Sequence, residues 1–292
     1  MHRIYGFCLV LVSAAAFGAM PIFARFAYAA GSDPVSLLFF RFLIGALCMA
    51  AVLRIKNVPF PRGRICVILF LMGFLGYAGQ STAYFTALTL IPAGLVAILL
   101  YLYPIMVMIM SVLFLNERAS AYKLLALIMA LGGTGMVIGL TSGGSTTGIV
   151  WALGAALIYS LYIVTGATVM RGSEPFSAAA VIMAGAAASL ALMAFWRGLN
   201  VPRVPSGWIW VACIGVLCTA LAISFFFGGM KAIGAVDASL ISTFEPVTTV
   251  VLACAFLGER IGPLQIAGMV LILCAAALLA LRPVPVEKTT VQ

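Results

Sequence analysis

Charge and histidine are scarce in this sequence, and both shortages narrow the chemistry open to the protein. Charged residues make up 8% of its 292 residues, and His2 is its one histidine. The seven cysteines lie in or at the ends of apolar runs and form no CxxC pair. Since metal sites are built from several clustered histidine, cysteine or carboxylate side chains, we expect no metal site, no redox centre and no cofactor. We interpret the cysteines as packing residues.

Motifs that drive enzymes and pumps are missing as well. No GxxxxGK[ST] sequence is present to cradle nucleotide phosphates. The apolar segments contain no histidine and no paired-aspartate motif for Ser-His or metal-assisted hydrolysis. The 16 basic residues are scattered at segment ends, whereas nucleic-acid binding gathers them on one face with aromatic residues between them. The sequence thus argues against an enzyme, a nucleotide-driven pump and a nucleic-acid-binding protein.

Apolar residues far exceed what a water-soluble core can hide. Hydrophobic residues account for 65% of the chain, and its mean hydropathy is +1.23, so the solvent must be lipid. A helix needs about 20 residues to cross roughly 30 Å of hydrocarbon. The pattern predicts an all-α integral membrane protein with ten spanning helices, near residues 4–28, 34–53, 65–88, 92–115, 121–140, 148–170, 177–196, 207–230, 235–257 and 263–281.

The distribution of basic residues predicts how these helices are oriented. If the N-terminus is cytoplasmic, eleven Lys and Arg residues fall inside, against Arg25, Arg197, Arg203 and Arg260 outside. Cytoplasmic loops are the ones that carry an excess of Lys and Arg. We therefore expect a multi-pass protein of the cell membrane with both termini in the cytoplasm.

An internal repeat with an offset of 142 residues organises the chain, and it places Pro104 on Pro246 near the middle of two apolar runs. Each copy holds five crossings, an odd number, so the second copy must enter the membrane from the opposite face. We predict two inverted five-helix repeats, residues 1–142 and 143–292, joined by a linker over residues 141–148. Inverted pairs of this kind recur in secondary transporters, where they give alternating access to a central site.

Three short patterns carry a family resemblance. Phe40-Arg41-Phe42 lies in the second segment, and a Phe-Leu-x-Glu-Arg signature closes the fourth and ninth segments, at residues 114–118 and 256–260. With ten crossings in two inverted sets, the chain resembles the EamA-type members of the drug/metabolite transporter superfamily over about residues 4–282. The resemblance implies a membrane carrier, commonly an exporter of amino acids, metabolites or drugs. It also implies a central cavity lined mainly by segments one, three, four, six, eight and nine.

The paired prolines are candidate hinges. Proline has no N–H and displaces the carbonyl four residues before it, so we expect Pro104 to free the carbonyl of Leu100 and Pro246 that of Ser242. An unsatisfied carbonyl at this depth costs several kcal/mol unless water, a side chain or a ligand reaches it. We expect these carbonyls to face the translocation path. The alternative is a structural kink satisfied by neighbouring serine or threonine hydroxyls.

Two charged residues deep in the apolar segments are functional candidates by default. Glu245 is either charged beside a partner or protonated, and it is suited to binding a substrate amino group or carrying a coupling proton; the alternative is a structural hydrogen bond. Arg41 must pair or snorkel. We interpret Arg41 as an architectural contact or a gate, with direct substrate binding as the alternative.

The two signature motifs supply the remaining charged candidates. Glu117 and Glu259 each follow a crossing and precede the next helix, where a carboxylate satisfies free N–H groups and opposes the positive helix end. With their neighbours Arg118 and Arg260, we expect them to be gate or structural elements and not substrate ligands.

Aromatic and polar side chains in the middle of the segments are candidate substrate ligands, because tyrosine combines apolar area with a hydroxyl that needs a partner. For each one, ordinary packing or an interfacial belt is the alternative. The full set of candidates is Phe17, Gln80, Tyr84, Tyr101, Tyr103, Tyr159, Tyr162, Phe225, Phe226, Ser242 and Glu245.

The leading interpretation is a secondary transporter that exports a small amphipathic metabolite, such as an amino acid, by alternating access. A passive channel or facilitator is the alternative. The expected partners are a small-molecule substrate, a coupling proton or other ion, and the lipid bilayer. Gly135 and Gly139 are four residues apart, as in closely packed membrane helices, and Gly132 and Gly133 come just before them. We expect these glycines to serve internal packing or the face of a homodimer.

Overall fold

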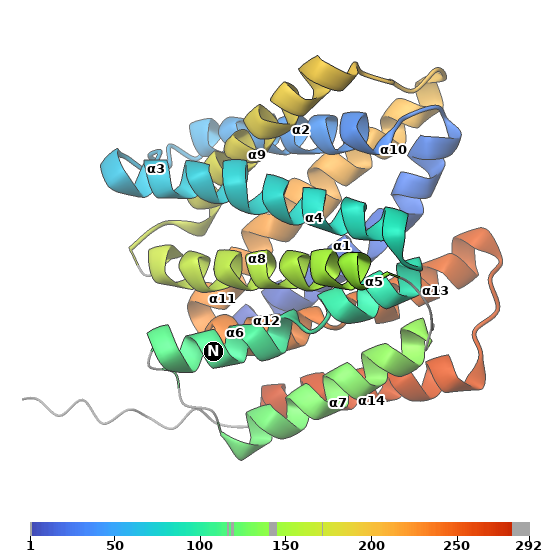
Figure 1. Cartoon of the computed structure of the whole chain (residues 1–292). Coiled ribbons are helices and arrows are strands. Elements are labelled where there is room, and N and C mark those ends of the chain that lie inside the picture. Colours follow the sequence, from blue (N-terminus) through green and yellow to red (C-terminus); the bar gives the residue numbers. More distant parts are fainter. Residues whose placement is uncertain (1, 116, 118–119, 140–144, 171, 282–292) are drawn as a thin grey trace, which may run out of the picture.

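The computed structural model describes residues 2–115, 117, 120–139, 145–170 and 172–281, and all regular secondary structure within these residues is helical. Within this described part of the chain, ten helical segments are long and apolar enough to cross a membrane, as predicted. Figure 1 shows them as one bundle of roughly aligned helices. In chain order they are α1 (His2–Ala29); α2 (Pro34–Ile55); α3 (Gly63–Leu71) with the π-helical η1 (Met72–Tyr77) and α4 (Ala78–Leu90); α5 (Ala93–Leu100) with α6 (Tyr103–Phe114); α7 (Ala121–Ile138); α8 (Thr146–Met170); α9 (Pro175–Arg197); α10 (Pro205–Gly215) with the π-helical η2 (Val216–Leu221) and α11 (Ala222–Ile233); α12 (Ala235–Ser242) with α13 (Glu245–Leu257); and α14 (Pro263–Leu281).

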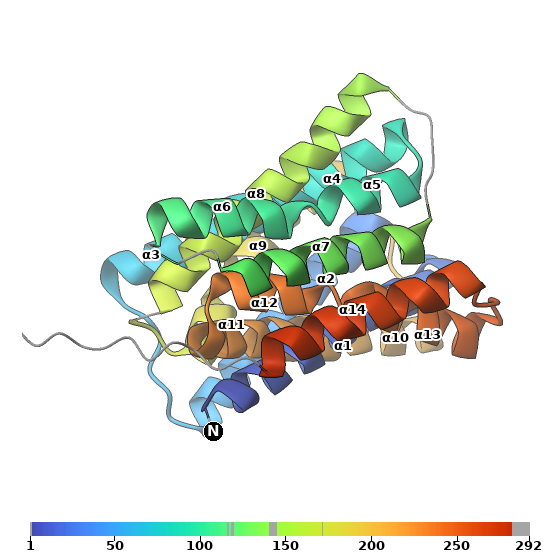
Figure 2. The same ribbon diagram turned by 90° about the horizontal axis from the view of Figure 1, so that it is seen from below.

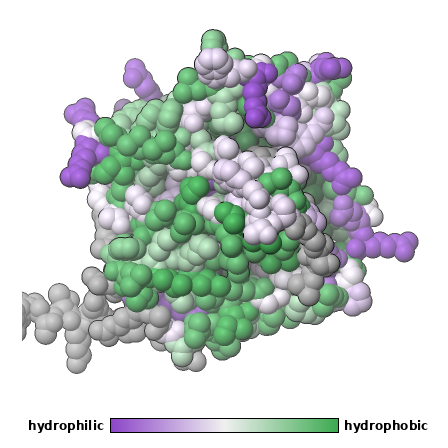
Figure 3. All heavy atoms as spheres, in the orientation of Figure 1, coloured by the Kyte–Doolittle hydropathy of each residue, from purple (hydrophilic) through white to green (hydrophobic). Residues whose placement is uncertain are grey.

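The surface of the bundle suits a lipid environment. Figure 3 shows apolar side chains over most of the visible face, with hydrophilic ones gathered toward its margins. Large apolar side chains such as Phe114 and Trp196 are exposed. A water-soluble protein rarely exposes apolar patches of this extent. The protein is therefore a multi-pass membrane protein.

The two ends of the bundle are distinguished by contacts between distant parts of the chain. Arg3 lies beside Asp237 and the carbonyl of Leu279, and we call this end the amino-terminal face. At the other end, Arg25 pairs with Glu259, and we call this end the opposite face. The names describe geometry only.

Helix starts at both faces follow the local sequence. Asp33 and Glu174 precede Pro34 and Pro175, and each carboxylate accepts a hydrogen bond of 2.7 Å from a backbone N–H in the first turn. Proline is favoured at this position because its missing N–H would have no partner. Burial raises the pKa of the Asp33 carboxyl, but hydrogen bonds from Ser36 and Asn200 outweigh burial and hold that pKa below its ordinary value.

Both membrane-centred prolines start new helices. The chain leaves the helix at Tyr101 and Leu102 between α5 and α6, and at Thr243 and Phe244 between α12 and α13. Pro104 and Pro246 each occupy the first turn of the second helix. Each candidate hinge is therefore a two-residue break, because proline is better suited to a helix start than to a helix interior.

Two other sequence expectations need correction. Thr146 to Gly148 belong to α8 and not to the linker, whereas residues 141–144 lie outside the described residues. Helices α7 and α14 lie side by side (Figures 1 and 2), but their closest approach is at Gly133 and Gly268. Gly135 has open space, and Gly139 ends α7 with a φ of 83°, so the internal packing expected at these two glycines is wrong, whereas Gly133 of the same group does make a close contact. The absence of side chains on Gly133 and Gly268 permits that approach.

Candidate functional site

A cavity of about 600 Å³ lies between the two halves of the chain. Its lining begins at mid-depth with Tyr103, Tyr159 and Glu245, and continues past Tyr84 to Tyr28 near the opposite face. Segments one, three, four, six, eight and nine contribute, as the resemblance implied, and α2 and α7 add further lining. The cavity therefore extends from the centre of the bundle toward the opposite face.

Glu245 is the only carboxylate among the described residues that line the cavity. It is the first residue of α13, and the hydroxyl of Tyr101 donates a hydrogen bond of 3.3 Å to its Oε2 atom. A carboxylate at the first turn of a helix also interacts favourably with the positive end of the helix dipole. The break before α13 thus sets an acidic group at the inner end of the cavity, beside a tyrosine that follows the equivalent helix α5.

Arg41 supplies the positive charge of the lining. Its side chain is buried, and its Nε donates a hydrogen bond of 2.7 Å to Oγ1 of Thr219. The guanidinium also lies over the ring of Phe42, 4.7 Å from the centroid, and 5.9 Å from that of Tyr77. Such cation–π contacts stabilise a guanidinium group that is shielded from water. Arg41 therefore contacts Thr219 and two aromatic rings, and it also contributes charge to the cavity.

The two π-helical segments position the partners of Arg41. Tyr77 is the last residue of η1, and Thr219 lies in η2, where its hydroxyl donates to the carbonyl of Ile214 five residues earlier. A π-helical turn shifts the side chains that follow it around the helix axis and is frequent at functional sites. The residues of the two segments occupy nearly equivalent places in the two repeats.

Tyrosine rings form a connected cluster at the inner end. The ring of Tyr103 packs edge-to-face on Tyr159 with centroids 4.7 Å apart, and Tyr101 lies 6.4 Å from Tyr103. Edge-to-face pairs stabilise such clusters beyond their buried area. The Tyr103 hydroxyl donates to the carbonyl of Ser239, and its own carbonyl accepts from Ser160. These contacts fix the floor of the cavity.

The candidate ligands, the two hinge prolines and Arg41 divide into two groups. Nine of the residues named from the sequence line the cavity: Phe17, Arg41, Gln80, Tyr84, Tyr101, Tyr103, Tyr159, Glu245 and Pro246. Four others do not: Pro104, Tyr162, Phe226 and Ser242 are buried in the bundle. Tyr162 packs between Tyr77 and Phe227, and the Ser242 hydroxyl returns to the carbonyl of Ala238. Phe225 is likewise absent from the lining.

Glu245 is held in place by a close contact between α1 and α13. The hydroxyl of Thr249 donates to the carbonyls of both Gly18 and Glu245, at 2.8 Å and 3.1 Å. A Cβ atom on Gly18 would lie 2.5 Å from the backbone oxygen of Glu245 and 2.7 Å from the Cβ of Thr248. Only glycine permits this approach without a shift of backbone.

We expect Gly18→Ala to separate α1 from α13 and displace Glu245. Overpacking of this kind costs about 1–3 kcal/mol, so the midpoint of thermal unfolding in detergent should fall by about 3–10 °C. Gly154→Ala is the matched control, since Gly154 lies in α8 with no neighbour within 4 Å of an added Cβ. If both variants unfold at the wild-type temperature, the contact does not position Glu245.

An ion network closes the bundle at the amino-terminal face. Nζ of Lys123 lies 3.2 Å from Asp237 and 3.5 Å from Glu117, and Arg3 lies 3.4 Å from Asp237. All four side chains are largely buried, with 7% of the Asp237 side chain exposed. Glu117 also accepts a hydrogen bond from the N–H of Ala235 at the start of α12. Glu117 therefore caps the start of α12 in the other half of the chain, in addition to its ion pair with Lys123 of α7.

The opposite face lacks an equivalent network among the described residues. Arg25 and Glu259 pair at 3.2 Å, but 64% and 57% of their side chains are exposed. Arg260 is exposed, and Arg118 lies outside the described residues. Exposed pairs contribute little to stability. The two faces thus differ: one is sealed by buried charges, and the other adjoins the cavity.

Several contributors to these sites were missed in the sequence. Tyr77 and Tyr28 line the cavity, and Asp237, Lys123 and Arg3 form the ion network. Asp237 lies inside the ninth apolar run and therefore had a sequence signal, but it is near the end of that run, where a charge is less costly than at the depth of Glu245. Tyr77 reaches the cavity through η1, and no sequence pattern that we used predicts a π-helical turn.

The sequence is similar to known membrane transporters along most of its length. An uncharacterized transporter from Archaeoglobus fulgidus is 29% identical over 279 residues, covering 95% of this chain and 97% of the relative. The aromatic amino acid exporter YddG of Ancylobacter novellus is 27% identical over 222 residues, or 74% of each chain.

Structural and family comparisons agree with this. A protein of known crystal structure superposes with a TM-score of 0.83 at 22% identity, over 94% of this chain and 96% of that one, and so shares its fold. The model of the EamA-like transporter family matches twice, at residues 4–139 and 146–281. The chain therefore belongs to the EamA-like transporter family.

Proposed function

We propose that the protein is a secondary transporter that exports a small amphipathic compound with an amino group, an aromatic amino acid being the first candidate. The observation that carries the proposal is the single carboxylate, Glu245, at the inner end of a cavity lined with tyrosines. A carboxylate binds an ammonium group through charge-assisted hydrogen bonds. Tyrosine faces provide apolar contact for a ring or chain and attract cations.

The charges of the cavity suit a zwitterion better than a simple amine. When ionised, Glu245 offers one negative charge to the cavity, and Arg41 on α2 offers one positive charge. Nε of Arg41 is occupied by Thr219, and the planar guanidinium has further donors for a carboxylate. The aromatic amino acid exporter among the relatives supports this choice of substrate class.

The direction of transport follows if the amino-terminal face is cytoplasmic, as the excess of basic residues on that side favours. The cavity then lies open toward the outside, and the ion network around Asp237 seals the cytoplasmic side. Such a state releases an exported substrate. To load it, the two halves must rearrange so that the network opens and the opposite face closes.

Purified protein in liposomes tests the proposal. Uptake of radiolabelled phenylalanine and tryptophan should saturate, and it should accelerate when the vesicles are preloaded with the same unlabelled amino acid. Glutamate and glucose serve as comparison solutes, and protein-free liposomes as the blank. Flux that never saturates and shows no countertransport would establish a passive facilitator instead. Repeating the assay with an imposed pH gradient tests for a coupling proton.

A further inference from the structure

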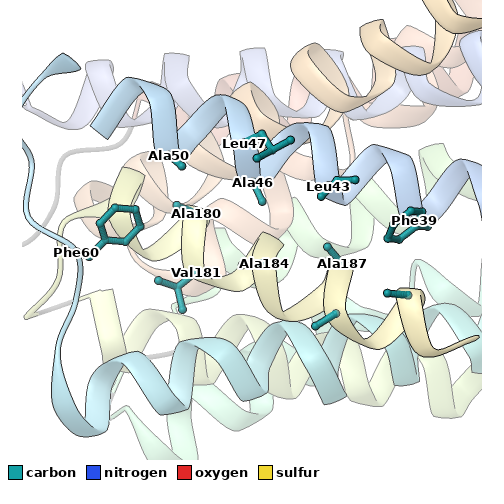
Figure 4. Close-up of a pocket in the computed structure, with 12 residues that line it drawn as sticks. Phe39, Leu43, Ala46, Leu47, Ala50, Phe60, Ala180, Val181, Ala184 and Ala187 are labelled. Carbon is teal, nitrogen blue, oxygen red and sulfur yellow. The ribbon is translucent and has the colours of Figure 1, made fainter. Parts of the chain in front are cut away.

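A second hollow lies on the lipid-exposed side of the bundle, between α2 and α9. This α2–α9 groove has a volume of about 490 Å³, and all of its lining side chains are apolar. Figure 4 shows Phe60 at one end and Phe39 at the other, with alanines of both helices between them. Seven of the twelve lining residues are alanine, and these small side chains leave the space open. The groove is separate from the central cavity, with which it shares no lining residue.

The groove runs along the central part of both helices, since Phe39 lies five residues after the start of α2 and Ala50 five residues before its end. It extends from Phe39 to Ala50 on α2 and from Ala180 to Ala191 on α9. Eleven helical residues span about 16 Å. The end at Ala50 and Ala180 lies toward the amino-terminal face, where Phe60 of the following loop continues the lining. The groove therefore has the direction and polarity of an acyl chain that enters from the amino-terminal face and reaches past the middle of the membrane.

Basic residues gather at this end of the groove. Arg54 and Lys56 end α2, Arg62 and Arg64 begin α3, and Phe60 of the groove lies on the loop between them. We call these four cations the basic cluster. All four are exposed, and none makes an ion pair with another described residue.

The remaining contacts near this end place the cluster beside the groove and do not neutralise it. Nζ of Lys56 lies 5.9 Å from the centroid of Phe176, one turn before Ala180 on α9. The carboxylate in this region, Glu174, accepts the N–H of Ser177 and caps α9. A net positive charge therefore stands where the headgroup of a lipid in the groove would lie.

We propose that the α2–α9 groove and the basic cluster form a specific site for an anionic phospholipid of the leaflet at the amino-terminal face. One acyl chain occupies the groove, and the phosphate and anionic headgroup contact Arg54, Lys56, Arg62 and Arg64. Basic residues just outside a membrane segment attract anionic headgroups, and burial of an acyl chain against apolar side chains fixes the orientation of the lipid.

A second copy of the chain is the other occupant to consider for a groove of small residues. Two-fold association through this groove would bring two basic clusters together at the same membrane face. Like charges at an interface oppose association. The charge distribution thus favours an anionic lipid over a homodimer.

Native mass spectrometry of the delipidated full-length protein tests the site. Phosphatidylglycerol should form a stoichiometric adduct. This adduct should remain bound at a collision energy that removes phosphatidylethanolamine of the same acyl composition. Replacing Arg54, Lys56, Arg62 and Arg64 together by glutamine should weaken phosphatidylglycerol binding by at least about tenfold. The matched control replaces Arg197, Arg203 and Arg260, exposed cations of the opposite face, and should bind as the wild type does.

The groove is tested separately from the charges. Ala184→Phe fills it from α9 and should weaken the same adduct, whereas Leu192→Phe, at an exposed position of α9 outside the groove, should not. Thermal unfolding of each variant without lipid establishes that it is folded. Equal binding of both lipids, or unchanged binding in the glutamine or Ala184→Phe variants, overturns the proposal. The proposal is also overturned if the wild-type protein forms a dimer that excludes lipid and if Ala184→Phe dissociates that dimer.

Discussion

Replacing Glu245 with glutamine is expected to lower saturable amino acid transport at least about tenfold. Glutamine keeps the shape and a hydrogen-bond acceptor for Tyr101, but it removes the one carboxylate that lines the cavity. Hydrogen bonds to a charged group are worth about 1.5–3 kcal/mol, or roughly a 10–100-fold change in binding. The loss should appear in proteoliposomes as a higher KM for substrates with an amino group.

Two further variants locate the cause of that loss. Tyr101→Phe removes the hydroxyl that donates to Glu245 and should cost only a few-fold, because one neutral donor is lost and the charge stays. Glu259→Gln is the matched control, since this carboxylate is 57% exposed and pairs only with Arg25 among the described residues. It should transport normally.

The pH dependence of the same variants separates the two roles of Glu245. If Glu245 only binds the amino group, the glutamine variant keeps whatever response to a pH gradient the wild type has. If Glu245 also carries the coupling proton, the variant loses that response along with affinity. A Glu245→Gln protein with unchanged rate, affinity and pH dependence contradicts both roles and leaves the carboxylate a structural hydrogen bond.

The sequence predicts the fold well because the membrane imposes strong constraints. Apolar runs of the required length located all ten spans, and the alignment of Pro104 with Pro246 located both helix breaks. What the repeat cannot predict is the form of each break. A proline in an apolar run is compatible with a kink or with a new helix start, and the packing of the neighbouring helices decides between them.

The site is only partly predictable for a related reason. Glu245 and Arg41 stand out because charge is expensive at their depth. Tyrosines carry no such signal: Tyr159 faces the cavity and Tyr162 faces the core, although both lie in the middle of α8. Their separation by three residues places them on neighbouring faces, and tertiary packing alone determines which face is open.

The two faces differ in their charged residues, and the internal repeat alone does not predict this difference. Positions one repeat away from Asp237 and Lys123 are Leu95 and Gln265, so the buried ion network has no charged counterpart there. Gln265 instead donates to the carbonyl of Val137 at the opposite face. The repeated fold therefore gives two similar halves, whereas a few unmatched side chains determine which face is sealed.

Asp237→Asn is expected to weaken the seal at the amino-terminal face and shift the protein away from the state with that face closed. The change removes the charge that Arg3 and Lys123 share, and leaves two partly buried cations with Glu117 and the Leu279 carbonyl as partners. Breaking a buried ion pair costs about 3–5 kcal/mol. The low end of that range applies here, because Lys123 keeps a second carboxylate.

A shift of about 3 kcal/mol changes the ratio of two conformations more than 100-fold. Hydrogen exchange followed by mass spectrometry should therefore speed up in α12 and in the facing part of α6, which pack together beneath the network. The apparent affinity for substrate added at the opposite face should fall, because the binding-competent state is less populated.

The exposed ion pair between Arg25 and Glu259 at the opposite face provides the control for Asp237→Asn. Glu259→Gln breaks an ion pair of 3.2 Å, as short as the contact between Lys123 and Asp237. Because its partners are solvated, the change should cost less than about 1 kcal/mol and leave hydrogen exchange in α12 unaltered. Equal effects of Asp237→Asn and Glu259→Gln would mean that burial of the network does not hold the amino-terminal face closed. A large effect confined to Asp237→Asn would identify the unmatched ions as the barrier that substrate binding must overcome.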